Sequence, residues 1–174
     1  LHEPFKGLFT QGMVTHQTYK NIKNEWIDPN EIIYDENQKI YLDKNNEIVK
    51  TGKIEKMSKS KKNVVDPSKI IEMYGSDTAR WFMISDSPPD RDLEWTDSGI
   101  GGSYKFINKI WRLVDQVLKS TESEFTNVDN EKLNNQLEVT ISNITKNIES
   151  FHFNKAVANV YELVNACQKT IDKK

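Results

Sequence analysis

The stretch SDSPPDRDLEWTDSG, residues 85–99, divides this sequence into two parts with different patterns. Pro88 and Pro89 cannot continue a helix, and each restricts the residue before it to extended backbone. We therefore expect an extended linker at this place. Before it, residues 1–95 are typical of the closing part of an α/β domain. After it, residues 96–174 are typical of the opening part of an all-α helical bundle.

Three apolar stripes with helical spacing follow the linker. The members of each stripe recur every three or four residues, which places them on one face of a helix. The stripes are Ile100, Tyr104, Ile107, Trp111, Val114 and Leu118; Leu133, Leu137, Ile141, Ile144, Ile148 and Phe151; and Val157, Val160, Val164, Cys167 and Ile171. Amphipathic helices of this length predict an antiparallel bundle. Three helices make a modest core, so we expect partner helices outside this chain.

The part before the linker mixes strand and turn signals. Within residues 30–50, three β-prone pieces (Ile32–Tyr34, Ile40–Leu42 and Ile48–Val49) are separated by the turn-forming runs DENQ and DKNN. This pattern predicts a small antiparallel meander that is inserted into the chain and lies over a larger structure. Within residues 1–18, the short apolar run GLFTQGMVT predicts a buried strand, with the side chains of Phe9 and Met13 in the core.

Two short helices are expected between residues 64 and 84. Asp66 is a natural N-cap, and Pro67 fits the first helical position. Gly75 is suited to the left-handed residue that ends a helix. Ser76 is then expected to cap the next helix. The side chains expected to face inward from that helix are Ala79, Phe82 and Met83.

Composition excludes several classes of protein. The 174 residues carry a net charge of −2, so a contact with a polyanion has to come from a local patch. The single cysteine, Cys167, rules out a disulfide framework within the chain and a cysteine-based zinc site. No run of about 18 apolar residues could cross a membrane, and the start lacks the apolar region of a signal peptide. We expect a cytoplasmic protein, and the first residue, Leu1, indicates a start inside a longer chain.

The local positive patch lies within TGKIEKMSKSKKNVVDP, residues 51–67. Five lysines fall within ten residues, and two serines alternate with them: Lys53, Lys56, Lys59, Lys61 and Lys62, with Ser58 and Ser60. Ammonium groups and hydroxyls are donors that phosphate oxygens accept from, and charge builds on those oxygens during phosphoryl and nucleotidyl transfer. A loop of this kind can therefore act as a phosphate clamp that closes on a nucleotide. A solvated surface loop, a targeting signal and a nucleic-acid patch are the alternatives.

The string KMSKS, Lys56–Ser60, resembles the KMSKS signature of class I aminoacyl-tRNA synthetases, and we call residues 56–60 the KMSKS loop. Other stretches resemble, in order along the chain, the bacterial type of the leucyl-tRNA synthetase family. They are TQGMV (10–14), DPSKIIEMYGSDTARWFM (66–83), SPPDRDLEWTDSGIGGSYKFINKIWRLV (87–114) and FNKAVANVYELVN (153–165). The resemblance covers nearly the whole chain.

This resemblance implies a fold and an activity. Residues 1–95 would be the end of a Rossmann-type catalytic domain with the meander as an insertion, and residues 96–174 the start of the anticodon-binding-type bundle. The family joins leucine to AMP, using ATP and Mg²⁺, and then transfers the leucyl group to the terminal adenosine of leucine tRNA. Mg²⁺ would come bound to ATP, and no metal ligands are expected in this chain.

The resemblance also implies roles for individual residues. Lys59 would be the main contact to the ATP phosphates and, with Lys56, the catalytic group, while Ser58 and Ser60 would support it. The helical bundle would dock leucine tRNA by shape and backbone contacts. Lys105, Lys109 and Arg112 lie along one helix and are candidates for phosphate contacts, with a solvated face as the alternative.

Several parts of the family are missing from these residues. The second class I signature, the editing domain and the leucine pocket are not present, so the chain is expected to be a fragment that cannot activate leucine alone. A stand-alone tRNA-binding module without ligase activity is the rival. An isoleucine, valine or methionine enzyme is a weaker third reading.

The linker and the glycines after it have further interpretations. Asp90, Asp92 and Glu94 could form a metal cluster, but an interdomain linker explains them better. Trp95 is expected to pack at a corner between domains. Three glycines, Gly99, Gly101 and Gly102, are expected to allow close helix packing.

Overall fold

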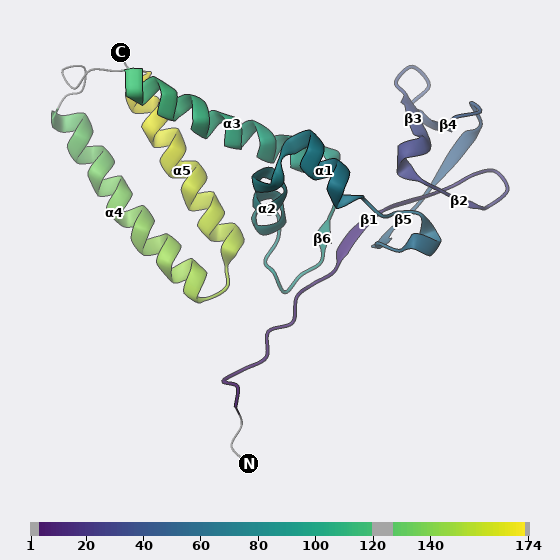
Figure 1. Cartoon of the computed structure of the whole chain (residues 1–174), viewed down its shortest axis with the longest axis horizontal. Helices are drawn as coiled ribbons and strands as arrows, with labels where there is room; N and C mark the ends of the chain where they lie inside the picture. Colours follow the sequence, from purple (N-terminus) through teal and green to yellow (C-terminus); the bar gives the residue numbers. More distant parts are fainter. Residues whose placement is uncertain (1–3, 120–126, 173–174) are drawn as a thin grey trace. The chain divides into compact units, whose positions relative to one another are not determined.

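The computed structural model describes residues 4–119 and 127–172, without the side chains of residues 127–130 (Figure 1). The chain forms two compact units, Leu1–Met73 with Asp90–Asp97, and Tyr74–Pro89 with Ser98–Lys174. The first unit holds the β-sheet and the second unit is helical, which confirms the predicted α/β plus all-α class. The predicted domain limits, 1–95 and 96–174, stay a prediction.

The first unit is built on a six-stranded sheet. Its strands are β1 Val14–Lys20, β2 Trp26–Ile27, β3 Ile32–Asp35, β4 Ile40–Asp43, β5 Ile48–Lys56 and β6 Leu93–Glu94. Their order across the sheet is β2-β1-β5-β4-β3, and β6 pairs with β1. The β3–β4 and β4–β5 pairs are antiparallel, so the predicted meander is confirmed.

Strand β5 is much longer than the sequence pattern indicated. It has nine residues and continues past the meander to Lys56, pairing with β1 from Lys20↔Lys50 to Thr15↔Lys56. The register shifts at Thr18, whose fully buried hydroxyl donates a 2.6 Å hydrogen bond to the Lys53 carbonyl oxygen. Strand β5 therefore joins the meander to β1 and ends where the KMSKS loop begins.

The predicted strand at GLFTQGMVT is wrong in its position. Strand β1 begins only at Val14, and the side chains of Phe9 and Met13 are 46% and 42% exposed rather than buried. Pairing with β6 determines where β1 begins, because the Leu93 amide donates a hydrogen bond to the Met13 carbonyl oxygen at 2.9 Å. The Met13 amide in turn donates to Asp92 Oδ1 at 2.8 Å.

The expected extended linker therefore contributes a strand. Leu93–Glu94 run parallel to β1, with Val14 opposite Leu93, and Trp95 is only 8% exposed. Asp92 has a structural role as an acceptor for the backbone of Met13. In the described residues no three His, Cys, Asp or Glu side chains lie close enough to hold a metal ion.

Replacing Gly12 with alanine should destabilise the first unit. An added Cβ would lie 1.9 Å from the Arg91 carbonyl oxygen, so the backbone beside β6 would have to move. We expect a loss of about 1–3 kcal/mol in the free energy of unfolding, the usual cost of overpacking. Chemical denaturation of the 174-residue chain would measure it. Gly101→Ala is the matched control, because a Cβ there meets no atom within 4 Å; equal stability of the two variants would contradict this prediction.

The two short helices are α1 Pro67–Tyr74 and α2 Ser76–Ser85. Asp66 caps α1 as expected, since its Oδ1 accepts the Ser68 amide at 2.9 Å. Gly75, with φ of 83°, separates the helices in the positive-φ region where glycine is favoured. The expected cap at Ser76 is wrong, because Gly75 occupies the cap position and no side-chain hydrogen bond caps α2. Phe82 is 2% exposed and faces inward as predicted.

The second unit contains the three long helices that the stripes predict. They are α3 Asp97–Lys119, α4 Asn127–Glu149 and α5 Phe153–Ile171. Helix α5 packs along α4 and also contacts α2 (Figure 1). Only residues 150–152 separate α4 from α5, so these two helices are antiparallel. None of the described helices is both long and apolar enough to span a membrane.

Helix α5 also packs against α3, and these two helices run in the same direction. Phe106 stacks on Tyr161, Lys109 Nζ donates to Asn165 Oδ1, and Gln168 Nε2 donates to Gln116 Oε1. The residue numbers of the contacting pairs increase together along both helices, which shows that the two helices are parallel. The core between them contains Phe106, Leu113 and Val164, with Trp81 of α2 packed against it. Burial in this region raises the pKa of the Cys167 thiol.

Parts of the predicted helix faces are exposed. Trp111 and Leu118 lie in the stripe of α3 but are 72% and 80% exposed. A Cβ at Gly101 or Gly102 would meet no atom within 4 Å, so the expected close packing at these two glycines is wrong for this chain.

Candidate phosphate-binding loop

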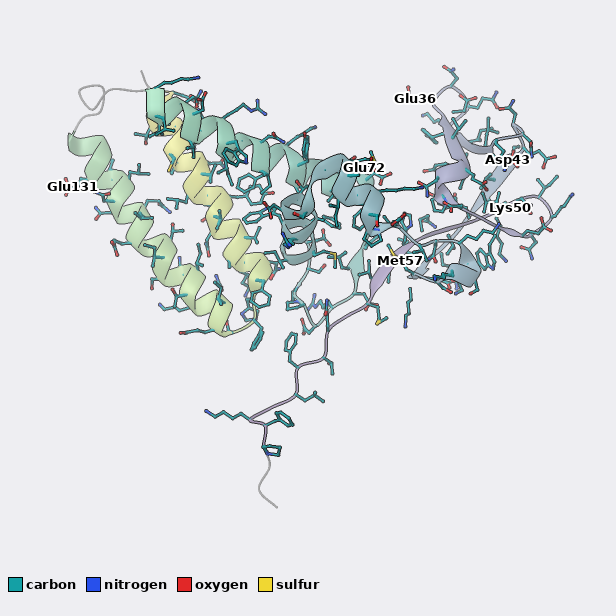
Figure 2. All side chains as sticks on the ribbon, in the orientation of Figure 1. Glu36, Asp43, Lys50, Met57, Glu72 and Glu131 are labelled. Atoms are coloured by element: carbon teal, nitrogen blue, oxygen red, sulfur yellow. The ribbon has the colours of Figure 1, made fainter. Side chains whose placement is uncertain are left out.

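The KMSKS loop follows β5 directly and makes a tight turn. Met57, labelled in Figure 2, donates its amide to the Val14 carbonyl oxygen at 3.1 Å, which extends the backbone pairing with β1 by one hydrogen bond. Ser58 is extended, and Lys59–Lys61 form one short 3₁₀ turn, η2. Lys62 then adopts a left-handed conformation with φ of 57°. The loop is therefore a short turn between the end of a strand and a sharp backbone reversal.

Asn63 fixes the base of this turn and was missed by reasoning from the sequence. Its side chain is fully buried, and its Oδ1 accepts the Ser58 amide at 2.8 Å. Its Nδ2 lies 3.2 Å from the carbonyl oxygens of His16 and Glu55, and 3.4 Å from that of Lys56. The signal in the sequence that could have identified Asn63 is its position, as a polar residue between a run of lysines and two valines.

The lysines of the KMSKS loop and the two lysines that follow it are not equivalent. Lys61 forms an ion pair with Glu55 on β5, so its charge is already neutralised within the sheet unit. Lys56, Lys59 and Lys62 are exposed and form no ion pair with any residue that the structure describes. Their ammonium groups remain available to an anion.

The two serines of the loop lie beside each other. Ser58 Oγ and Ser60 Oγ are 2.8 Å apart, within hydrogen-bonding distance. The predicted residues Lys56, Ser58, Lys59 and Ser60 thus form one continuous segment of strand end and turn. Their binding role stays a prediction.

A hollow of about 500 Å³ beside the loop is unsuited to phosphate. Its lining includes Ser60 and Lys62 together with three acidic residues, Glu25, Glu31 and Asp43. Lys44 also lines it but is paired with Glu31 at 3.1 Å. Negatively charged residues in the lining disfavour an anion there, and Lys56 and Lys59 do not line this hollow.

The basic residues of α3 are partly engaged within the helical unit. Lys109 donates to Asn165 on α5 at 2.7 Å, and Arg112 Nε donates to the Asn108 carbonyl oxygen at 3.4 Å. Lys105 is exposed. A phosphate contact by Lys109 would have to compete with its hydrogen bond between helices.

The segment that contains the KMSKS loop matches a known protein family. Residues 44–96, which include β5, the KMSKS loop and β6, match the family model of tRNA synthetases class I (I, L, M and V). The KMSKS loop, β5 and β6 are thus similar to the corresponding segment of class I tRNA synthetases, whereas β1 lies outside the matched range.

Curated relatives narrow this class. A leucine–tRNA ligase of Rhizorhabdus wittichii is 48% identical over 173 residues, which cover 96% of this chain and 19% of the relative. A leucine–tRNA ligase of Rickettsia bellii is 44% identical over 173 residues, covering 99% of this chain and 20% of the relative. The chain belongs to the leucine–tRNA ligase family, and it spans about one fifth of the length of these relatives.

A solved structure has a similar fold. It is the ternary complex of Agrobacterium radiobacter K84 agnB2 LeuRS with tRNA and LeuAMS. The match has a TM-score of 0.66 and 24% identity, and covers 98% of this chain and 18% of that one. This likeness supports the fold, a small sheet followed by a helical bundle.

Proposed function

We propose that this chain is the part of a leucine–tRNA ligase that holds the phosphates of ATP while leucyl-adenylate forms. The observation that carries the proposal is the exposed ammonium group of Lys59, which forms no ion pair within residues 4–119 and 127–172 and stands at the start of a turn fixed by β5 and Asn63. A charge in a preorganised position stabilises a transition state better than one that has to reorganise.

In the proposed reaction, a carboxylate oxygen of leucine forms a bond to the α-phosphorus of ATP. The bond from this phosphorus to the bridging oxygen breaks, and pyrophosphate leaves with the electron pair. Negative charge grows on the leaving phosphates, where Lys59, supported by Lys56, stabilises it. The hydroxyls of Ser58 and Ser60 add neutral donors. Mg²⁺ would come bound to ATP as part of the substrate, as the family resemblance implies.

The helical unit is proposed to bind leucine tRNA. The related LeuRS was solved with tRNA and LeuAMS, and the family model that matches residues 44–96 describes tRNA synthetases. Lys105 is the exposed basic residue of α3 that has no hydrogen bond or ion pair within the described part of the chain. A stand-alone tRNA-binding module without catalysis remains the rival function.

A chimera would test the proposed function. The corresponding segment of the Rickettsia bellii relative is replaced by these 174 residues, and leucine-dependent ATP–pyrophosphate exchange and tRNA charging are measured. We expect both activities within about tenfold of the unmodified ligase, because the match covers nearly the whole chain. The isolated chain should show no exchange above background.

The control is the same chimera with Lys56 and Lys59 both replaced by alanine, which should lose exchange but keep tRNA binding. A folded chimera that binds tRNA but catalyses nothing, even with its lysines intact, would favour the rival. Exchange by the isolated chain would contradict the expected dependence on the rest of the ligase.

A further inference from the structure

One buried amide connects three segments at the base of the KMSKS loop. Asn63 Nδ2 donates to the His16 carbonyl oxygen of β1 and the Glu55 carbonyl oxygen of β5, each at 3.2 Å. Asn63 Oδ1 accepts the Ser58 amide at 2.8 Å. The main-chain carbonyl oxygen of Asn63 lies 3.3 Å from His16 Nδ1, a distance that suits donation from the ring.

These contacts define the direction in which the chain leaves the sheet. The hydrogen bond to Ser58 holds the residue immediately before η2, while the bonds from Nδ2 hold the two strands below it. Asn63 is 0% exposed, so water cannot replace a lost partner without opening the loop. The position of Lys59 is therefore tied to β1 and β5 through a side chain that does not itself face an anion.

We propose that Asn63 is a positioning residue for Lys59. Its amide sets the backbone of Ser58, and so the start of the turn from which the Lys59 side chain reaches phosphate. The catalytic consequence of this arrangement rests on the proposed function, whereas the fixed backbone is a property of this chain alone. A shift of about 1 Å in a catalytic group can change a rate about 10²-fold, so this constraint matters for the reaction.

A purely structural role for Asn63 would have different consequences. Thr18 provides the comparison, because it too is fully buried between β1 and β5 and donates to a β5 carbonyl oxygen, that of Lys53. Thr18 Oγ1 donates to Lys53 and the Thr18 carbonyl oxygen accepts from Gln17 Nε2, so neither of these hydrogen bonds involves the KMSKS loop. Thr18→Val thus removes a buried hydrogen bond from the same sheet and leaves the turn at Ser58 in place.

The first experiment measures the turn itself. Hydrogen exchange of the Ser58 amide is followed by NMR in the 174-residue chain, in the wild type and in Asn63→Ala and Thr18→Val. We expect exchange at Ser58 to be at least about tenfold faster in Asn63→Ala, since the amide loses a buried acceptor. In Thr18→Val the exchange rate at Ser58 should stay as in the wild type.

The second experiment measures catalysis in the full-length ligase. Asn63→Ala should lower the kcat of adenylate formation by about 10-fold to 10²-fold, with a smaller change in the KM for ATP. Transfer of leucine from preformed adenylate to tRNA should stay within about threefold of the wild type, because that step does not use the triphosphate. Asn63→Asp keeps the volume and the acceptor for Ser58 but replaces the amide that anchors it to β1 and β5 with an oxygen that the His16 and Glu55 carbonyl oxygens repel, so the anchor is lost without a cavity and the same split is expected.

The outcomes separate the two proposals. If Ser58 exchange is unchanged in Asn63→Ala, or if Asn63→Ala and Thr18→Val slow both chemical steps equally, the positioning role is overturned. If Lys59→Ala leaves adenylate formation unchanged, the proposed function fails, and the exchange measurement still decides whether Asn63 holds the turn.

Discussion

Replacing Lys59 with alanine in the full-length ligase is expected to lower leucyl-adenylate formation by about 10²-fold or more, in line with the loss of a preorganised donor. The ammonium group is exposed and has no ion pair in the described residues, so its removal leaves no acidic partner uncompensated. The stability of the sheet unit should therefore change little. The effect belongs to the transition state, in which charge moves onto the leaving phosphates.

ATP–pyrophosphate exchange at saturating leucine would measure this effect. Lys50→Ala is the matched control, because Lys50 is an exposed lysine on β5, the strand that leads into the KMSKS loop, and lies outside that loop (Figure 2). Lys50→Ala removes one positive charge from the same unit, so it measures how much any lysine of that unit contributes electrostatically to the rate. Equal rates for the two variants would remove Lys59 from the mechanism.

Truncating Phe106 to alanine should cost the helical unit about 3–5 kcal/mol of unfolding free energy, the range for large aromatic side chains in a core. Phe106 is 5% exposed and stacks on Tyr161 with ring centroids 3.6 Å apart. Its ring also stacks on Trp81, at 5.3 Å between centroids. The truncation therefore removes the contact surface shared by α2, α3 and α5.

Urea denaturation of the 174-residue chain, followed by helical circular dichroism, would give the free energy of unfolding. Trp111→Ala on the same helix is the control. The Trp111 side chain is 72% exposed, so its truncation should change the free energy of unfolding little. A Phe106→Ala variant as stable as Trp111→Ala would show that this aromatic cluster does not hold the unit together.

The fold was predictable where the signal is local. Helical spacing gave α3, α4 and α5, and turn-forming residues separated the strands of the meander. The start of β1 and the existence of β6 were not predictable in this way. Both depend on the pairing of Val14 with Leu93, which lie far apart in the sequence and carry no periodic pattern.

The site was predictable in part. The density of lysines identified the loop, and the family resemblance, rather than composition, singled out Lys59. Two features were hidden because they are tertiary contacts. Lys61 looks like another free cation in the sequence until Glu55 is seen beside it. Asn63 looks like a turn residue, but it reaches back to His16 on β1.

The interleaving of the two units has a consequence for synthesis on the ribosome. The chain passes from one unit to the other at residues 73/74, 89/90 and 97/98. Val14 and Thr15 of β1 therefore leave the ribosome long before their partners Leu93 and Glu94 in β6, and that end of the strand lacks this pairing while α1 and α2 are translated. Translation at about 5–20 residues per second makes this an interval of several seconds. During that time the Val14–Thr15 end of nascent β1 is open to a chaperone or to a neighbouring chain.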